Sequence, residues 1–186
     1  MKNLLILLVF LAMAACDNSL TDKEKQEYAN KGNEISQATF KVLSEKLTEQ
    51  MKLGGPAQAL PFCNVEAMPL TKQLSDQYDV TIKRTSDKWR NQKNKPTARE
   101  LEIINNYHKL ISEKQEITPI VEVDSNNNKH YYAPIILKAN CLACHGKVGE
   151  FVSVKTDSII KSLYPNDKAV GYNEGDLRGI WSVSFE

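Results

Sequence analysis

The residues whose spacing most clearly predicts chemistry are 141–145, which read Cys-Leu-Ala-Cys-His. This C-x-x-C-H spacing is that of a c-type haem attachment site. The two-residue gap presents both thiols to one edge of a porphyrin, where each can form a thioether with a vinyl group. The histidine that follows then lies under the iron as its proximal ligand. The motif therefore predicts one covalently bound haem c, attached through Cys141 and Cys144 and ligated by His145.

Cys63 is the candidate for a second ligand to the iron. The chain has four cysteines, at positions 16, 63, 141 and 144. If Cys16 carries lipid and the motif carries haem, Cys63 has no disulfide partner in a compartment where spare thiols oxidise. Cys63 is then either a buried, inert thiol or a thiolate that binds the iron opposite His145. Met68 is the competing axial ligand, since thioether ligation is common in cytochromes c.

The same cysteines and histidine are compatible with one other cofactor. Cys63, Cys141, Cys144 and His145 make up the Cys₃His ligand set of a structural zinc site. An enzyme is not expected, because no acid–base pair or activated nucleophile stands out in the sequence. Two protein ligands on the iron would also leave no open position for a substrate.

The N-terminal residues predict export and a lipid anchor. Residues 1–15 contain an early lysine, a short apolar run and small residues before Cys16, which is the layout of a secretory signal. The apolar run is shorter than the roughly 20 residues that a permanent membrane-spanning helix needs. Small residues followed by cysteine resemble a bacterial lipobox, so we expect Cys16 to be acylated; plain secretion is the alternative. Residues 16–20 would then tether a periplasmic domain, residues 21–186, to a membrane.

Length and charge narrow the choice of partners. About one domain remains after the signal, because domains usually contain roughly 100 to 200 residues. The 24 lysines and arginines nearly balance the 23 aspartates and glutamates, which argues against a nucleic-acid partner. We therefore expect haem, a membrane contact through the lipid, and a protein redox or signalling partner.

The elements around the motif predict an α+β domain. Apolar residues at three- and four-residue steps indicate a long N-terminal helix, which Gly54-Gly55-Pro56 ends. Thr97 and Glu100 form the capping box of a later helix. Helices that alternate with mainly hairpin-linked strands favour an antiparallel sheet. The predicted helices are 21–51, 57–78 (interrupted by Pro61 and Pro69) and 97–113, the predicted strands are 80–84, 117–123, 130–137 and 180–185, and residues 152–164 suggest a strand and a short helix.

Several side chains outside the motif are candidates for contacts with the haem. Arg84 and Arg90 lie in a polar segment dense in hydrogen-bond donors, and the planar guanidinium group suits a haem propionate. A solvated basic loop explains the same residues equally well. A later loop, punctuated by glycines, carries the further polar candidates Tyr172, Asp176 and Arg178.

The other two histidines are not expected to bind iron. His108 falls on the inner face of the helix at 97–113, where a histidine is more often a hydrogen-bonded side chain than a ligand. His130 follows the tip of the predicted hairpin, and we expect it to be exposed.

The order of these residues resembles a known family. The resemblance rests on residues spread along the chain after the signal, in this order: Cys63, then 84–86, then Arg90, Asn91, Asn94 and Pro96, then 141–146, and finally residues of 164–179 that include Tyr164, Asp167, Ala169 and Arg178. In this respect the chain is similar to the Tll-type PAS-like c-type haem domain family, first described for a cyanobacterial protein. The resemblance implies a PAS-like antiparallel sheet flanked by helices. It also implies a haem with histidine on one side and a cysteine thiolate on the other, here His145 and Cys63.

The resemblance bears on function as well. Members of the family occur as stand-alone exported proteins and as periplasmic sensing halves of kinases, cyclases and chemoreceptors. A thiolate opposite an imidazole stabilises ferric iron, which implies a low reduction potential, and its bond weakens on reduction. We therefore expect an exported redox or diatomic-gas sensing module that reports to a separate partner. A low-potential electron-transfer cytochrome c is the alternative.

Overall fold

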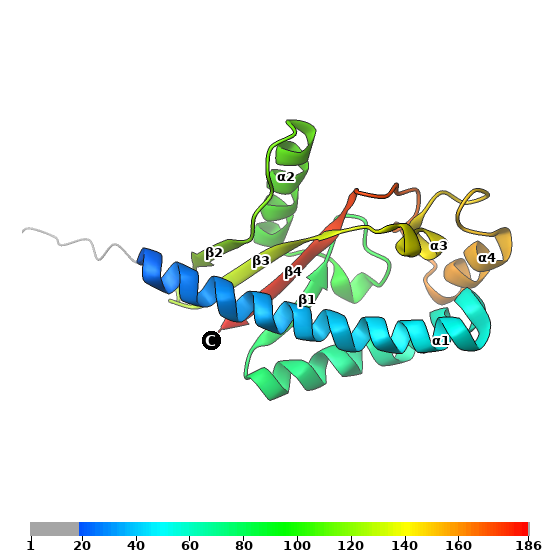
Figure 1. Ribbon diagram of the computed structural model, residues 1–186, viewed down its shortest axis with the longest axis horizontal. Helices are drawn as coiled ribbons and strands as arrows, with labels where there is room; N and C mark the ends of the chain where they lie inside the picture. Colours follow the sequence, from blue (N-terminus) through cyan, green and yellow to red (C-terminus); the bar gives the residue numbers. More distant parts are fainter. Residues whose placement is uncertain (1–18, 186) are drawn as a thin grey trace, which may run out of the picture.

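The computed structural model describes residues 19–185, which form a long helical hairpin, a four-stranded sheet and shorter helices (Figure 1). The predicted signal peptide, the lipidation of Cys16 and most of the predicted tether lie outside these residues. None of the helices in residues 19–185 is both long and apolar enough to cross a membrane. The elements are α1 (Asp22–Tyr78), β1 (Thr81–Thr85), η1 (Gln92–Asn94), α2 (Ala98–Ser112), β2 (Ile120–Val123), β3 (Lys129–Ile136), η2 (Ala139–Cys141), α3 (Leu142–His145), α4 (Val154–Leu163) and β4 (Leu177–Phe185).

Helix α1 consists of two arms that fold back on each other. The arms meet at Gly55, whose φ of 63° is a left-handed conformation that glycine adopts without steric cost. Figure 1 shows the first arm, 22–53, and the second arm, 56–78, running antiparallel. The break between two helices is confirmed at the predicted place. The second arm continues through Pro61 and Pro69, so the predicted interruption there is wrong.

The sheet has the strand order β1-β4-β3-β2, and its neighbouring strands are antiparallel. Strands β2 and β3 confirm the predicted hairpin. Strand β4 lies in the centre of the sheet, between β1 and β3, although it comes last in the chain. It begins at Leu177, earlier than the expected start at Ile180, because Leu177 pairs with Ile136 beyond a register shift in β3.

Helices cover both faces of the sheet, and neighbouring residues of β3 point to opposite faces. Tyr131 packs with α1 and Tyr132 packs with α2. The first arm approaches so closely that a Cβ atom at Gly32 would lie 2.2 Å from Cγ of Tyr131. The core on the α1 side contains Ile35, Leu74, Ile82, Tyr131, Ala133, Trp181 and Val183, and the core on the α2 side contains Ile103, Ile104, Tyr107, Tyr132, Leu177 and Ile180. The predicted α+β class, with an antiparallel sheet flanked by helices, is confirmed.

Three side chains are not placed as predicted. The apolar periodicity of their predicted helices places Val65 and Leu101 in the core, but they are 63% and 39% exposed. His130 was expected in solvent, yet its side chain is only 18% exposed. The register of β3 and β4 places His130 opposite Ser184, whose Oγ lies 2.9 Å from Nδ1, while Asp124 Oδ2 lies 3.2 Å from Nε2. The strand pairing therefore partly buries a histidine that its position beside a turn had suggested would be exposed.

Two smaller predictions are also corrected. His108 lies on the exposed side of α2, where its Nε2 is 3.3 Å from Asp87 Oδ2, so it has a partner as expected but not on the inner face. The short helix predicted within 152–164 is confirmed as α4, but in place of the strand the structure has a single bridge between Val148 and Val152.

Candidate functional site

The C-x-x-C-H motif forms one helical turn between β3 and α4. Helix α3 follows η2 directly, so the backbone is helical across the whole motif. Cys141 and Cys144 are half-buried free thiols, and burial raises the pKa of the Cys144 thiol although the charge of Arg90 opposes the rise. At Gly146, which ends the turn, a Cβ atom would lie 2.6 Å from Cβ of Phe151. Glycine is therefore required where the chain leaves the motif.

His145 presents one ring nitrogen to a potential metal. Its Nδ1 lies 2.7 Å from the carbonyl oxygen of Ala169. Because a carbonyl oxygen only accepts, Nδ1 carries the proton and Nε2 is the free nitrogen of a neutral ring, the form that binds metals. Burial, with the charges of Arg178 and Arg90, lowers the pKa of His145 well below its ordinary value. A hydrogen bond of this kind is the usual way in which a ligating histidine is oriented.

The loop after α4 holds the motif from the other side. The N–H of Gly171 donates to the carbonyl oxygen of Gly146 at 2.9 Å, and the N–H of Tyr172 donates to that of His145 at 3.0 Å. The Tyr172 ring meets the imidazole edge to face, with the ring centroids 6.3 Å apart. The motif and this loop are therefore joined by backbone and ring contacts into one unit.

Arg90 ties this unit to the segment that follows β1. Its Nε donates to Asp167 Oδ1 at 3.1 Å, and its Nη2 donates to the carbonyl oxygens of Cys144 at 2.7 Å and Ala169 at 3.1 Å. The ion pair is buried, since the Arg90 and Asp167 side chains are 12% and 6% exposed. The structure thus places Arg90 at the site, with Nε and Nη2 engaged by the protein. Its contact with a propionate stays a prediction.

Cys63 reaches the same site from the second arm of α1. Its thiol is half-buried, and burial raises its pKa while the charges of Arg84 and Arg90 oppose the rise. Cys63 also acts electrostatically on Cys144, so the two lie near each other although they are far apart in the sequence. Met68 lies further along the same arm and is half-buried. The role of Cys63 as a ligand stays a prediction.

The alternative zinc site is not formed. Within residues 19–185, no three side chains of histidine, cysteine, aspartate or glutamate are placed to share a metal ion. A structural zinc ion needs four ligands around one point. The Cys₃His zinc alternative is therefore wrong.

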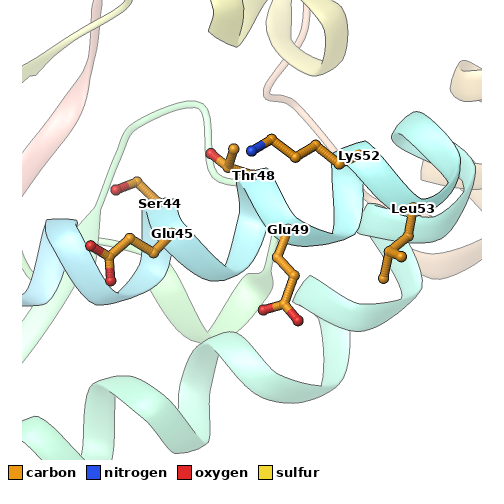
Figure 2. A pocket seen from close by; sticks show the side chains of 6 residues that line it. All are labelled: Ser44, Glu45, Thr48, Glu49, Lys52 and Leu53. Carbon is orange, nitrogen blue, oxygen red and sulfur yellow. The ribbon is translucent and has the colours of Figure 1, made fainter.

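Two surface hollows differ in their relation to the motif. The larger, of about 500 Å³, is lined by side chains of 44–53 on the first arm of α1 (Figure 2), and none of the predicted site residues lines it. The smaller, of about 190 Å³, is lined by residues that include Arg90, Tyr164 and Asn64, the neighbour of Cys63. The smaller hollow is therefore the one that belongs to the site.

Two further arginines approach the motif. Cζ of Arg84 lies 5.8 Å from the ring centroid of Trp181, and Cζ of Arg178 lies 5.7 Å from that of Tyr172. Nη1 of Arg178 also donates to the carbonyl oxygen of Lys88 at 3.1 Å. Burial and the charge of Arg178 lower the pKa of Arg84. The structure thus brings together two arginines that come from β1 and β4.

The comparisons with known proteins agree with this arrangement. A model of the Tll0287-like family (Tll0287) matches residues 17–186. The chain belongs to the Tll0287-like family. The crystal structure of the cyanobacterial heme-protein Tll0287 matches with a TM-score of 0.60 at 22% sequence identity, over 80% of this chain and 90% of that one. At that identity, the match shows that the fold is shared. No curated protein gave a significant match.

The family resemblance drawn from the motifs is therefore confirmed for this Tll0287-like chain, but the sequence did not reveal how its parts join. Asp167 and Ala169 belonged to the pattern that carried the resemblance, and that pattern was their only signal. The carboxylate of Asp167 pairs with Arg90, and the carbonyl of Ala169 accepts from both Arg90 and His145. A backbone carbonyl has no residue type to identify it, so only the structure could assign this role.

Proposed function

We propose that this Tll0287-like protein binds one haem c, attached through thioethers of Cys141 and Cys144. The observation that carries the proposal is the hydrogen bond from Nδ1 of His145 to Ala169, which leaves Nε2 for the iron. Both motif cysteines are free thiols on one helical segment, as attachment to one porphyrin edge requires. The relative of known structure is described as a heme-protein, which supports the same cofactor here.

We propose that His145 and Cys63 would be the two protein ligands of the iron. Haem would supply a one-electron ferric–ferrous couple and, when ferrous, affinity for CO or NO. Arg84 and Arg90 lie near the Cys63 thiol and favour its thiolate, and coordination to a cationic metal removes the thiol proton. An anionic Cys63 stabilises the more oxidised iron and lowers the reduction potential.

These two ligands favour a redox or diatomic-gas sensing module. Cys63 is carried by the helical hairpin, whereas His145 is locked to Ala169 within the motif unit. If both residues held the iron, the Cys63 side chain would be free to move with the hairpin, whereas that of His145 would be held by Ala169. Movement of the second arm of α1 would then report the state of the iron to a protein partner. No enzymatic activity is proposed, since His145 and Cys63 would together leave no open position on the iron for a substrate.

A low-potential electron-transfer cytochrome is the second candidate. Val148 and Phe151 directly follow the motif, and they are 38% and 46% exposed. Exposed apolar side chains at such a place are suited to brief contact with a redox partner. A carrier of this kind would keep both axial ligands in both oxidation states.

We further propose that the protein is a periplasmic lipoprotein, attached to a membrane through Cys16. The support is the signal layout of residues 1–15 and the small residues directly before Cys16. The full-length Cys16→Ser variant should move from the membrane fraction to the soluble periplasmic fraction. If wild-type protein is already soluble there, plain secretion replaces lipid anchoring.

Spectroscopy tests the cofactor directly. Full-length protein made in a host with cytochrome c maturation machinery should gain the mass of one haem and give a c-type pyridine haemochrome spectrum. The double variant Cys141→Ala/Cys144→Ala should lose the covalent haem. Colourless wild-type protein of apo mass from that host would contradict the proposal.

Ligand binding and electron exchange separate the two candidate functions. A sensing module should change its ferrous spectrum on addition of CO or NO, with loss of the Cys63 bond. A carrier should leave the spectrum unchanged and exchange electrons rapidly with a low-potential redox protein.

A further inference from the structure

Arg84 and Arg178 bring more positive charge to the site than the described residues neutralise. Arg178, Arg90 and Arg84 all act electrostatically on His145. Asp167 pairs with Arg90, with its Oδ1 3.1 Å from Nε. Within residues 19–185, no carboxylate forms an ion pair with Arg84 or Arg178. Asp167 acts electrostatically on Arg178, but its ion pair is with Arg90. Partly desolvated cations need a counter-charge.

The hydroxyl group of Tyr172 adds a donor without an acceptor. The side chain is 5% exposed, and its hydroxyl has no partner at hydrogen-bonding geometry in the described part of the chain, although Ser86 and Arg178 lie beside it. Nζ of Lys88 lies 4.1 Å from the centroid of the same ring. The side chains of Arg84, Arg178 and Lys88 and a buried hydroxyl thus gather where, within residues 19–185, no carboxylate forms an ion pair with them.

We infer that the side chains of Arg84 and Arg178, with the hydroxyl of Tyr172, form a pocket that binds a propionate group of the haem. The inference rests on the proposed function and names the residues that would recognise the anionic edge of the cofactor. A carboxylate fits this donor set, because guanidinium groups bind it bidentately and a tyrosine hydroxyl donates one hydrogen bond.

The position of the pocket agrees with the proposed axial ligands. Tyr172 contacts the ring of His145, and Arg84 is the cation with the largest effect on Cys63. The pocket therefore lies beside the two residues, His145 and Cys63, that would hold the iron. A thiolate at Cys63 offsets one positive charge at most, which leaves a second guanidinium for a carboxylate.

The sequence had indicated Arg84 and Arg90 as the propionate ligands, whereas the structure favours Arg84 and Arg178. Arg90 is already neutralised by Asp167 and braced against two carbonyl oxygens. Arg178 donates from Nη1 to the backbone carbonyl of Lys88, and another neighbour in the described part of the chain is the Tyr172 side chain. If Arg178 had a structural role only, it would act through its contacts with the protein. The test therefore needs a measured property that does not change when the hydrogen bond to Lys88 is lost.

The test uses the haem-loaded, full-length protein and the variants Arg178→Gln, Arg178→Lys and Arg84→Gln. The reduction potential is measured from about pH 4 to about pH 8, where a propionate released from a cation titrates. The other charged or titratable groups that face the pocket come from the elements packed around it, and all of them are unchanged in these variants: Cys63, Asp87, Lys88, Arg90, His145, Tyr164, Asp167 and Tyr172. Arg99→Gln, which removes an exposed arginine paired with Glu122, is the matched control.

Arg178→Gln should lower the potential near pH 8, because a positive charge beside the haem disfavours ferric iron. The pKa of the propionate should rise by roughly 1 to 3 pH units on loss of the guanidinium, so the potential should rise as the pH falls. Wild type, Arg178→Lys and Arg99→Gln should show little of this dependence. If Arg178→Gln yields no soluble protein, Arg84→Gln decides by the same criteria.

Two outcomes would overturn the inference separately from the proposed function. Full haem loading with a wild-type potential at every pH in Arg178→Gln or Arg84→Gln would show that these side chains do not bind a propionate. If the reduction potential changed equally in Arg178→Lys and Arg178→Gln, and did not vary with pH in either variant, Arg178 would have a structural role only. Absence of covalent haem from the wild type would instead contradict the proposed function.

Discussion

His145 donates a hydrogen bond from Nδ1 to the carbonyl oxygen of Ala169 at 2.7 Å. The same oxygen accepts from Nη2 of Arg90 at 3.1 Å. One backbone atom therefore sets the tautomer of the histidine and links it to the buried pair of Arg90 and Asp167. The direction in which Nε2 points depends on contacts from outside the motif as well as on the motif itself.

Replacement of Cys63 tests the thiolate ligand. In haem-loaded Cys63→Ala, we expect a changed ferric spectrum and a potential raised by roughly 0.1 to 0.3 V, within the range of about 0.8 V that axial ligands span. The physical reason is that the variant loses an anion which stabilises ferric iron. Spectroelectrochemistry measures both effects. Met68→Ala is the matched control on the same helical arm, and a change in Met68→Ala with none in Cys63→Ala would make Met68 the ligand.

Removal of Arg90 should destabilise the protein strongly. Arg90→Gln leaves the carboxylate of Asp167 buried without its cation, which costs about 3 to 5 kcal/mol of unfolding free energy. The double variant Arg90→Gln/Asp167→Asn should lose less than the sum of the two single variants. Urea unfolding followed by circular dichroism measures these differences. Arg99→Gln, at an ion pair whose arginine side chain is 53% exposed, should cost less than about 1 kcal/mol.

Gly32 tests the packing of α1 on the sheet. Glycine to alanine in a helix interior normally stabilises by about 1 kcal/mol. Here the added Cβ atom would lie 2.2 Å from Cγ of Tyr131, so the helix or the ring must move, and overpacking costs about 1 to 3 kcal/mol. We therefore expect Gly32→Ala to lower the thermal midpoint. Asn33→Ala, on the exposed side of the same turn, should leave it unchanged or raise it, and a more stable Gly32→Ala would contradict the close packing.

Asp124 should make stability depend on pH in acid. Partial burial favours its neutral form, but hydrogen bonds from His130, Asn128 and Asn126 outweigh this and lower its pKa from 3.8 to about 2. A carboxyl group with a lowered pKa stabilises the fold fully above its unfolded pKa and loses this effect as the pH falls through its folded pKa. Stability should therefore fall between about pH 4 and about pH 2.

Urea midpoints measured across this range check the assignment. Asp124→Asn should be less stable than wild type at neutral pH and should show a smaller fall in acid. Asn126→Ala keeps the backbone N–H that donates to Asp124 and should follow the wild-type curve. If the stability of Asp124→Asn fell as much in acid as that of wild type, groups other than Asp124 would cause the fall.

The elements that could be predicted have their signals within a few residues. In the capping box of α2, the N–H of Glu100 donates to the Thr97 hydroxyl at 3.2 Å, and the N–H of Thr97 donates to the Glu100 carboxylate at 2.7 Å. The turn between β2 and β3 is closed by Asp124, whose N–H donates to the carbonyl of Asn128 at 3.0 Å. Such local hydrogen bonds favour the same structure in any surrounding fold, so sequence patterns predict them well.

Side-chain burial was harder to predict, because it depends on the neighbour that each element meets. Val65 lies on a regular helix but faces solvent, since nothing packs on that side of the second arm among the described residues. His130 follows a turn but is covered, because β4 pairs with its strand. Periodicity shows that a helix or strand has two sides, whereas packing decides which side is buried.

The amino-acid sequence by itself determined the chemistry of the Cys141–His145 motif, the order of helices and strands, and membership of the family, because these depend on residue types and short spacings. Only the tertiary structure decided that Arg90 pairs with Asp167, that Cys63 comes close to Cys144, and that Arg84 and Arg178 come near each other beside His145. These partners lie far apart in the chain. Their meeting depends on the register of β1, β3 and β4 and on the fold of the α1 hairpin, which no local preference specifies.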